Sequence, residues 1–215
     1  MAIDNDMIIA LVASRVCHDL ASPLQALTTA LDVLEGDNGP EMHKSAVDLI
    51  RESTMQASAK VDFMRSTFGS LTAGAGDANL TDLRNIATKY IATLKPILDW
   101  QSAREMVSRP LARIVMNFIM IAIDSLPRGG EIIVTDTQHG DLLEFNIKAQ
   151  GPRVMLKPAM RLGLQGLSPE EGYDGRSIQP YLAYLAASKH KIELAAREDE
   201  QSITLIARMQ DKAIY

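Results

Sequence analysis

Four histidines are the side chains in this sequence best suited to nucleophilic or proton-transfer chemistry. They are His18, His43, His139 and His190, and the single cysteine, Cys17, precedes the first of them. None of these residues is spaced from another like the ligands of a metal site. The sequence also has no Walker-type loop, no Gly-x-Ser-x-Gly motif and no Cys–His pairing of a thiol enzyme. Most hydrolase and NTPase mechanisms therefore lack support.

His18 lies on the polar side of a segment with helical periodicity. The apolar residues of this segment recur at steps of four and three, at Val16, Leu20, Leu24, Leu27, Leu31 and Leu34. At 100° per residue, His18 points about 160° away from this seam. Its own face holds Ser14, Ala21, Ser22, Gln25, Thr29 and Asp32. A flat surface around a solvated imidazole would let another protein's active site close over the ring. An ordinary surface histidine is the alternative, and helix geometry by itself favours it.

Residues 5–70 predict a helical hairpin. The first helix stops at the turn formed by residues 36–39, and Pro40 can open the second. The second apolar stripe consists of Ile50, Ala57, Val61, Met64 and Phe68. Because two helices bury only part of these faces, we expect a second hairpin to complete a four-helix bundle, which makes a homodimer. Packing of the hairpin on the rest of its own chain is the alternative.

The second helix also offers candidates for binding a partner. The hairpin turn centres near residue 38, so His18 should lie opposite about residue 58. Met55, Asp62 and Phe63 point away from the apolar stripe in this region. Together with Ser14, Ala21, Ser22 and Gln25, they form the predicted docking surface around His18. For Phe63, packing against the chain's own C-terminal domain is the alternative.

The remainder of the chain mixes helical and strand patterns. Residues 71–79 are small and glycine-rich, and form the expected linker between residues 1–72 and 80–215. Helical patterns occupy residues 80–96, 108–126 and 175–190, and strand patterns occupy residues 131–135, 142–147, 191–195 and 202–207. Pro180 should lie in the first turn of the last helix or kink it. Helices on one face of a mixed sheet make an α+β sandwich.

The composition is that of an ordinary globular protein, with 47% hydrophobic residues, 23% charged residues and a net charge of −5. The absence of a basic block argues against a nucleic acid or an anionic membrane as partner, although a small local docking patch stays possible. One cysteine excludes an intrachain disulfide. The N-terminus does not resemble a signal peptide, and the longest apolar run, residues 114–123, is shorter than the roughly 20 residues of a membrane span. We therefore expect a cytoplasmic protein.

The string from Cys17 to Leu24 resembles the H box of sensor histidine kinases, His-Glu/Asp-Leu-Arg-Thr-Pro-Leu. Ala21 and Ser22 replace the arginine and the threonine, whereas Pro23 is retained in mid-helix, where a proline costs about 3 kcal/mol. The resemblance makes His18 the phospho-acceptor. It also makes Asp19 the acidic neighbour that orients the ring and takes up its proton, with a solvated helix charge as the alternative.

Residues 113–134 are similar to the N box of the same kinases and the strand that follows it. The position of the metal-binding asparagine holds Ile121, and Asn117 stands at the other, non-chelating asparagine. The first glycine box, Asp-x-Gly-x-Gly, corresponds to residues 149–153, which read Ala-Gln-Gly-Pro-Arg. The second, Gly-x-Gly, corresponds to residues 175–177, which read Gly-Arg-Ser. The pattern of the fold is kept while the nucleotide-binding residues are replaced, so we expect no ATP binding.

A histidine-bearing hairpin joined to a degenerate kinase domain is typical of the ChpT-type histidine phosphotransferases of alphaproteobacteria. The chain resembles this family over roughly residues 8–210, including the motifs at residues 13–19, 98–100 and 151–158. The resemblance implies an α+β fold, in which residues 1–72 form the dimerising phosphotransfer hairpin. Residues 80–215 would form a degenerate kinase-like, Bergerat-like α/β sandwich that does not bind a nucleotide.

The same resemblance implies a function. His18 would relay a phosphoryl group between the receiver domain of a hybrid histidine kinase and the receiver domains of cell-cycle response regulators. The receiver would supply its own Mg²⁺, and the chain would need no cofactor. Two alternatives are an ATP-dependent sensor-type histidine kinase core and a catalytically silent dimeric adaptor in which His18 is incidental. The lost acidic and glycine residues weigh against the kinase.

Overall fold

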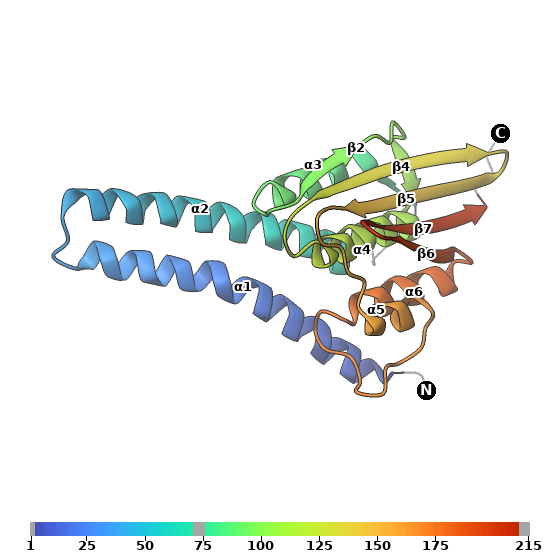
Figure 1. The fold of residues 1–215 in the computed structure, drawn as a ribbon, viewed down its shortest axis with the longest axis horizontal. Coiled ribbons are helices and arrows are strands. Elements are labelled where there is room, and N and C mark those ends of the chain that lie inside the picture. Colours follow the sequence, from blue (N-terminus) through green and yellow to red (C-terminus); the bar gives the residue numbers. More distant parts are fainter. Residues whose placement is uncertain (1–2, 71–75, 211–215) are drawn as a thin grey trace.

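The computed structural model describes residues 3–70 and 76–210 and shows a long helical hairpin attached to an α/β domain (Figure 1). The hairpin consists of α1 (Asn5–Glu35) and α2 (Pro40–Met64), and Pro40 occupies the first turn of α2 as predicted. A short π-helix, η1 (Arg65–Ser70), continues α2. Five residues of the predicted linker, 71–75, lie outside the described residues.

The α/β domain is built on a five-stranded sheet with the order β2-β4-β5-β7-β6. Its strands are β2 (Ile97–Trp100), β4 (Glu131–His139), β5 (Leu142–Gln150), β6 (Glu193–Asp199) and β7 (Ser202–Gln210). The β2–β4 pair is parallel and the other pairs are antiparallel. A separate antiparallel pair joins β1 (Asp77–Asn79) to β3 (Met106–Ser108).

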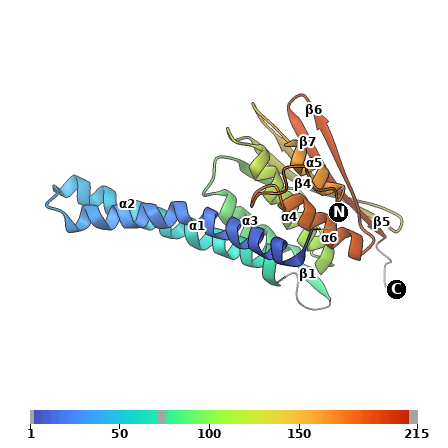
Figure 2. The same ribbon diagram turned by 90° about the horizontal axis from the view of Figure 1, so that it is seen from below.

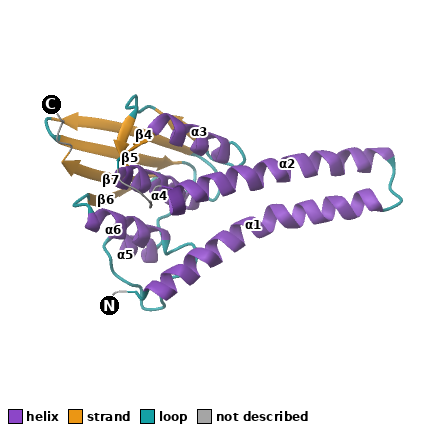
Figure 3. Ribbon diagram, turned by 180° about the vertical axis from the view of Figure 1, so that it is seen from behind, coloured by secondary structure: helices purple, strands orange, loops and turns teal. Residues whose placement is uncertain are grey.

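Helices cover one face of the sheet (Figure 3). They are α3 (Leu80–Ile91), α4 (Arg109–Ser125), α5 (Pro158–Leu164) and α6 (Gln179–Lys189). The burial of side chains along β5 alternates accordingly: Leu143, Phe145 and Ile147 are buried, and the residues between them are half-buried. The middle of α4 is buried on all sides, because it lies between the sheet and the other helices. This arrangement confirms the predicted α+β sandwich.

Some boundaries differ from the predictions. α3 ends at Ile91 and not near residue 96, because the chain turns there to enter β2, a strand that the sequence patterns did not reveal. The last helix begins at Gln179 and not at Gly175, because Asp174 holds the preceding residues in a turn of their own. Pro180 lies in the first turn of α6, as predicted. Sequence patterns also missed α5, β1 and β3, which are short elements.

The contact between α1 and α2 does not follow the predicted seam. The buried residues of α1 are Arg15, Asp19, Pro23 and Ala30, whereas Leu24 and Leu31 are 54% and 50% exposed. The other seam residues, Val16, Leu20, Leu27 and Leu34, are half-buried, so the fully buried positions of α1 lie beside the seam and hold small or polar side chains. The heptad face of α1 is left partly on the surface of the single chain.

The N-terminal part of α1 passes along α6 (Figure 2), where Leu11 and Val12 pack beside Tyr181 and Leu182. By length and composition alone α1 is also apolar enough to cross a membrane, with a mean hydropathy of 1.3 over an 18-residue window. A single apolar helix near the N-terminus is a weak indication of a membrane span. Here the helix is a member of the hairpin and is bound to α4 by the ion pair between Arg15 and Asp124.

Candidate functional site

His18 projects from the middle of α1 with 61% of its side chain exposed, which confirms the predicted placement. Its Nδ1 lies 3.2 Å from Oδ1 of Asp19. Within the described residues, the other ring nitrogen, Nε2, has no hydrogen-bond partner. The Asp19 carboxylate is an acceptor, so the neutral ring carries its proton on Nδ1. Nε2 is then left with a free lone pair directed away from Asp19.

Asp19 is buried, so the alternative of a solvated helix charge does not hold for this residue. Its Oδ2 accepts a hydrogen bond of 2.7 Å from Nε of Arg15, one turn earlier on the same helix. Arg15 therefore holds one oxygen of the carboxylate while His18 faces the other. This arrangement fixes the carboxylate that orients the imidazole.

Pro23 explains why the backbone carbonyl of Asp19 contacts the second helix. In a regular helix the N–H of residue 23 would donate to the carbonyl of Asp19, but proline has no N–H. Lys60 of α2 donates to that carbonyl instead, with Nζ 2.7 Å from the oxygen. The proline of the H-box-like string thus exposes a carbonyl that the second helix uses. Lys60 also confirms the prediction that His18 lies opposite about residue 58.

Arg15 connects the hairpin to the α/β domain. Its terminal nitrogens donate to the two carboxylate oxygens of Asp124, on α4, at 2.8 and 3.2 Å. The side chain of Arg15 is only 4% exposed, and that of Asp124 is 15% exposed. A continuous chain of contacts therefore runs from Asp124 through Arg15 and Asp19 to the ring of His18.

Burial and neighbouring charges shift the pKa values of Asp19, Arg15 and Lys60. Burial alone would raise the pKa of Asp19, but the charge and hydrogen bond of Arg15, aided by His18 and Lys60, leave this pKa below its usual range. Burial would lower the pKa of Arg15, and the carboxylates of Asp124 and Asp19 raise it instead. Burial lowers the pKa of Lys60. Asp19 is consequently ionised beside His18 at neutral pH.

A pocket of about 260 Å³ adjoins His18. It lies between α1 and the loop before α6, and its lining comprises Ser14, Arg15, His18, Asp174, Gly175 and Arg176. Of the predicted docking residues, Ser14 thus lies beside His18 in one cavity. Sequence patterns did not place the loop at residues 174–176 near the histidine.

A second groove, of about 470 Å³, lies between α1, α2 and the end of α3. It brings the predicted residues Ser22 and Met55 together. Ala21, Gln25 and Asp62 are exposed as predicted, but they line neither of these cavities.

The prediction for Phe63 is wrong. Its side chain is fully buried in the main core, with its ring centroid 4.9 Å from that of Tyr90 on α3. The helical wheel of α2 placed Phe63 away from the α1 contact correctly. That side of α2 is covered by α3 of the same chain, which was the alternative considered for this residue.

The positions that correspond to nucleotide-binding residues do not fit a nucleotide. Ile121 is fully buried in the core of α4, and Ala149 is buried in β5, between Ile132 and Ile203 of the neighbouring strands. The side chain of Asn117 is engaged in hydrogen bonds within the protein, because it donates to the carbonyl of Arg113 and accepts from Gln179 of α6. None of these groups is available to an adenine or a metal ion.

The cavity between α5 and the loop before α6 also suits a triphosphate poorly. Its volume is about 620 Å³, and Lys157 is its one cation, opposed by the carboxylates of Glu170, Glu171 and Asp174. A tetra-anion would meet net repulsion there. Among the described residues, no group of three or more His, Cys, Asp or Glu side chains could hold a metal ion.

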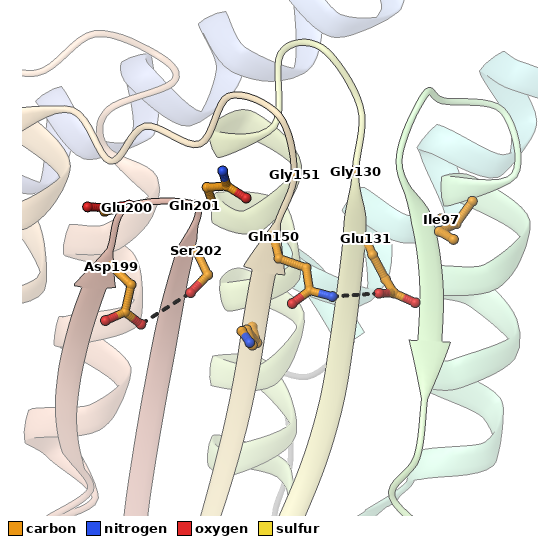
Figure 4. A pocket seen from close by; sticks show the side chains of 10 residues that line it. Ile97, Gly130, Glu131, Gln150, Gly151, Asp199, Glu200, Gln201 and Ser202 are labelled. Carbon is orange, nitrogen blue, oxygen red and sulfur yellow. Dashed lines mark hydrogen bonds between the residues drawn. The ribbon is translucent and has the colours of Figure 1, made fainter.

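A larger hollow of about 1050 Å³ opens at one end of the sheet, and no residue of the hairpin lines it (Figure 4). Four of its polar side chains are paired: Gln150 donates to Glu131 at 2.8 Å, and Ser202 donates to Asp199 at 3.2 Å. This hollow is broad and open, and neither a histidine nor a cysteine is among its lining residues. The site that can do chemistry is therefore the one around His18.

Comparisons with known proteins agree with this fold. The family model of the histidine phosphotransferase C-terminal domain matches residues 80–202. The protein phosphotransferase ChpT of Brucella abortus (strain 2308) is 30% identical over 198 residues, which cover 92% of this chain and 93% of that protein. The 1.7 Å structure of a bacterial phosphotransferase superposes with a TM-score of 0.85 at 29% identity, covering 96% of this chain and 98% of that one.

A more distant structure is similar to this chain in fold alone. The catalytic domain of the histidine kinase ThkA is 14% identical, with a TM-score of 0.50, and covers 65% of this chain and 98% of that one. The family model and the Brucella relative are matched over most of the chain, and both are phosphotransferases. The chain therefore belongs to the histidine phosphotransferase family and is a ChpT-type phosphotransferase of a two-component phosphorelay.

Proposed function

We propose that His18 is the residue on which this phosphotransferase carries the phosphoryl group, through its Nε2 atom. One observation supports this most directly. The imidazole is exposed, its Nδ1 is held by the buried carboxylate of Asp19, and its Nε2 has no hydrogen-bond partner in the described part of the chain. Such a ring has a fixed orientation and one accessible nucleophilic nitrogen.

The transfer step follows from this geometry. A receiver domain presents a phosphoaspartate, and the lone pair of Nε2 forms a bond to phosphorus while the bond from phosphorus to the aspartate oxygen breaks. The aspartate leaves as a carboxylate with the electron pair of that bond. The ring retains its proton on Nδ1 and becomes a phosphoimidazolium. The reverse sequence, with the carboxylate of a second receiver as nucleophile, returns the electron pair to Nε2.

Asp19 acts on this step through the ring. The imidazolium that forms carries a positive charge, and the carboxylate 3.2 Å from Nδ1 stabilises it. Arg15 and Lys60 keep this carboxylate ionised and in place. Asp19 is thus a positioning and charge-stabilising residue, and it does not contact the phosphoryl group.

The partners in this proposal are the receiver domain of a hybrid histidine kinase and the receivers of cell-cycle response regulators, in the cytoplasm. The exposed face of α1 with Ser14, Ala21, Ser22 and Gln25 surrounds His18, and Met55 and Asp62 extend that surface onto α2. The receiver brings the Mg²⁺ that offsets phosphoryl charge. Phe63 has no part in this surface, because it is buried.

We also propose that the hairpin pairs with a second copy in a four-helix bundle. Leu24 and Leu31 lie seven residues apart, on one face of α1, and are exposed in the single chain. Val47 and Val61 of α2 are spaced by two heptads and are also exposed. Water-exposed apolar stripes on both helices are what a partner hairpin would bury.

In the same proposal the chain does not use ATP, and its α/β domain supports the hairpin. The buried Ile121 and Ala149 and the acidic cavity near α5 argue against a nucleotide. The ion pair between Asp124 and Arg15 gives the domain a different role, because it braces α1 three residues before His18.

Incubation with a receiver that carries labelled phosphoaspartate tests the assignment. The wild type should take up label, and the His18→Gln variant should take up none while melting at nearly the same temperature, since an exposed substitution changes stability little. His139→Gln, at an exposed histidine at the end of β4, is the matched control and should behave as the wild type. Label on the His18→Gln variant would refute the assignment.

A further inference from the structure

We infer that the pocket between α1 and the loop before α6 is a binding site for the phosphoryl group, in which Arg176 supplies the cation. This inference rests on the proposed role of His18 and adds to it a residue from the α/β domain. His18, Ser14 and Arg176 all line the same cavity of about 260 Å³. A phosphoryl group on the imidazole would therefore extend into a space that an arginine borders.

Gly175 holds the loop against α1. A Cβ atom at residue 175 would lie 3.1 Å from the backbone nitrogen of Arg15 and 3.3 Å from its Cα. These distances are closer than ordinary packing allows, so the loop reaches the helix because residue 175 has no side chain. The contact falls at Arg15, one helical turn before His18. Arg176 follows directly and is consequently placed beside the histidine.

The turn around Gly175 is fixed by its own hydrogen bonds. Oδ1 of Asp174 accepts from the backbone N–H groups of Arg176 and Ser177, at 2.9 and 2.6 Å. The hydroxyl of Ser177 accepts from the N–H of Asp174 at 2.8 Å. One oxygen of Asp174, the one carboxylate that lines the pocket, is thus engaged within the turn.

The guanidinium of Arg176 differs from that of Arg15 in its hydrogen bonds and ion pairs. Arg15 is buried and bonded to both Asp19 and Asp124. Arg176 is exposed, and across residues 3–70 and 76–210 its guanidinium makes no hydrogen bond or ion pair. An arginine beside a phosphorylated nitrogen can donate two parallel hydrogen bonds to phosphoryl oxygens. The exposed hydroxyl of Ser14, one turn before His18, is a further donor at the same cavity.

The ligand of this site is a phosphoryl group bonded to nitrogen, or passing between nitrogen and a carboxylate oxygen. No additional bond forms or breaks. Arg176 neutralises negative charge on the phosphoryl oxygens while the imidazole and the receiver carboxylate exchange the phosphorus atom. The segment that corresponds to the second glycine box of the kinases would then serve the histidine and not a nucleotide.

The test measures single-turnover transfer of label from a phosphorylated receiver to the full chain. Arg176→Ala should lower the rate by about tenfold to a hundredfold, as expected for loss of a charge-assisted contact. Arg176→Lys should recover part of it. Gly175→Ala should slow transfer although Arg176 is present, because the added methyl group moves the loop off α1. Arg197→Ala, at an exposed arginine of β6, should leave the rate unchanged.

A second readout separates phosphoryl binding from a structural effect. Phosphorus NMR of the phosphorylated protein against pH gives the pKa of the phosphoryl group, which a nearby cation lowers. The pKa should be higher in Arg176→Ala than in the wild type and unchanged in Arg197→Ala. A wild-type rate and a wild-type phosphoryl pKa in Arg176→Ala would overturn this inference, provided that His18→Gln takes up no label. Label on His18→Gln would instead refute the assignment of His18 itself.

Discussion

Replacing Asp124 with asparagine tests whether the α/β domain holds the phosphotransfer site in place. The substitution keeps the shape of the side chain and removes its charge, so Arg15 keeps Asp19 but loses its carboxylate partner on α4. Two bonds between charged groups, at 2.8 and 3.2 Å, become at most one bond to a neutral acceptor. Since charge-assisted bonds contribute about 1.5–3 kcal/mol each, the net loss of stability should be about 2 kcal/mol.

Thermal unfolding followed by circular dichroism measures this loss. For a chain of this size, about 2 kcal/mol lowers Tm by roughly 4–8 °C. Asp48→Asn is the matched control, because Asp48 pairs with Arg51 at 3.2 Å on the open surface of α2, and its Tm should change by less than about 1 °C. Phosphoryl uptake should also slow several-fold in Asp124→Asn, since Arg15, which holds Asp19 beside the ring of His18, loses its own partner on α4. A Tm shift and a rate equal to those of Asp48→Asn would refute the reasoning.

Three further predictions concern Lys60, the exposed face of α1 and nucleotide binding. Lys60→Met leaves the carbonyl of Asp19 without its donor and should lower the free energy of unfolding in urea by about 1–3 kcal/mol. This loss should be smaller in the Pro23→Ala background, because the N–H of alanine can bond to that carbonyl. Equal losses in both backgrounds would contradict the account. Leu31→Glu, on the exposed face of α1, should convert a dimer to a monomer in light scattering while helical content is retained, and an unchanged mass would exclude this face as the interface. Titration calorimetry with MgATP should detect no binding, and a dissociation constant in the low micromolar range would return the chain to the kinase class.

The sequence predicted the fold class and the position of His18 because both depend on local patterns. The periodicity of α1 placed the imidazole on the polar side of the helix, and alternation of apolar residues marked β4, β5, β6 and β7. The H-box-like string directed attention to Asp19. The turn at residues 36–39 set the register that brings Lys60 opposite Asp19.

The contacts that complete the site could not be predicted from these patterns, because they join residues far apart in the sequence. Arg15 and Asp124 are 109 positions apart, and no local pattern pairs them. The buried Arg15–Asp19 pair has the i,i+4 spacing of a helical ion pair, and this was the available signal that Asp19 is more than a surface charge. Phe63 was placed on the correct side of α2, but the helix that covers it belongs to the other part of the chain.

The most direct test of the account is a pulse and chase between two receiver domains. The protein is first labelled from one phosphorylated receiver, repurified, and then mixed with a second, unphosphorylated receiver in the absence of ATP. The account predicts that peptide mapping finds the label on His18 after the pulse and that the label moves to the second receiver during the chase. Label on another residue, or label that stays on the protein when the second receiver is added, would contradict the central claim.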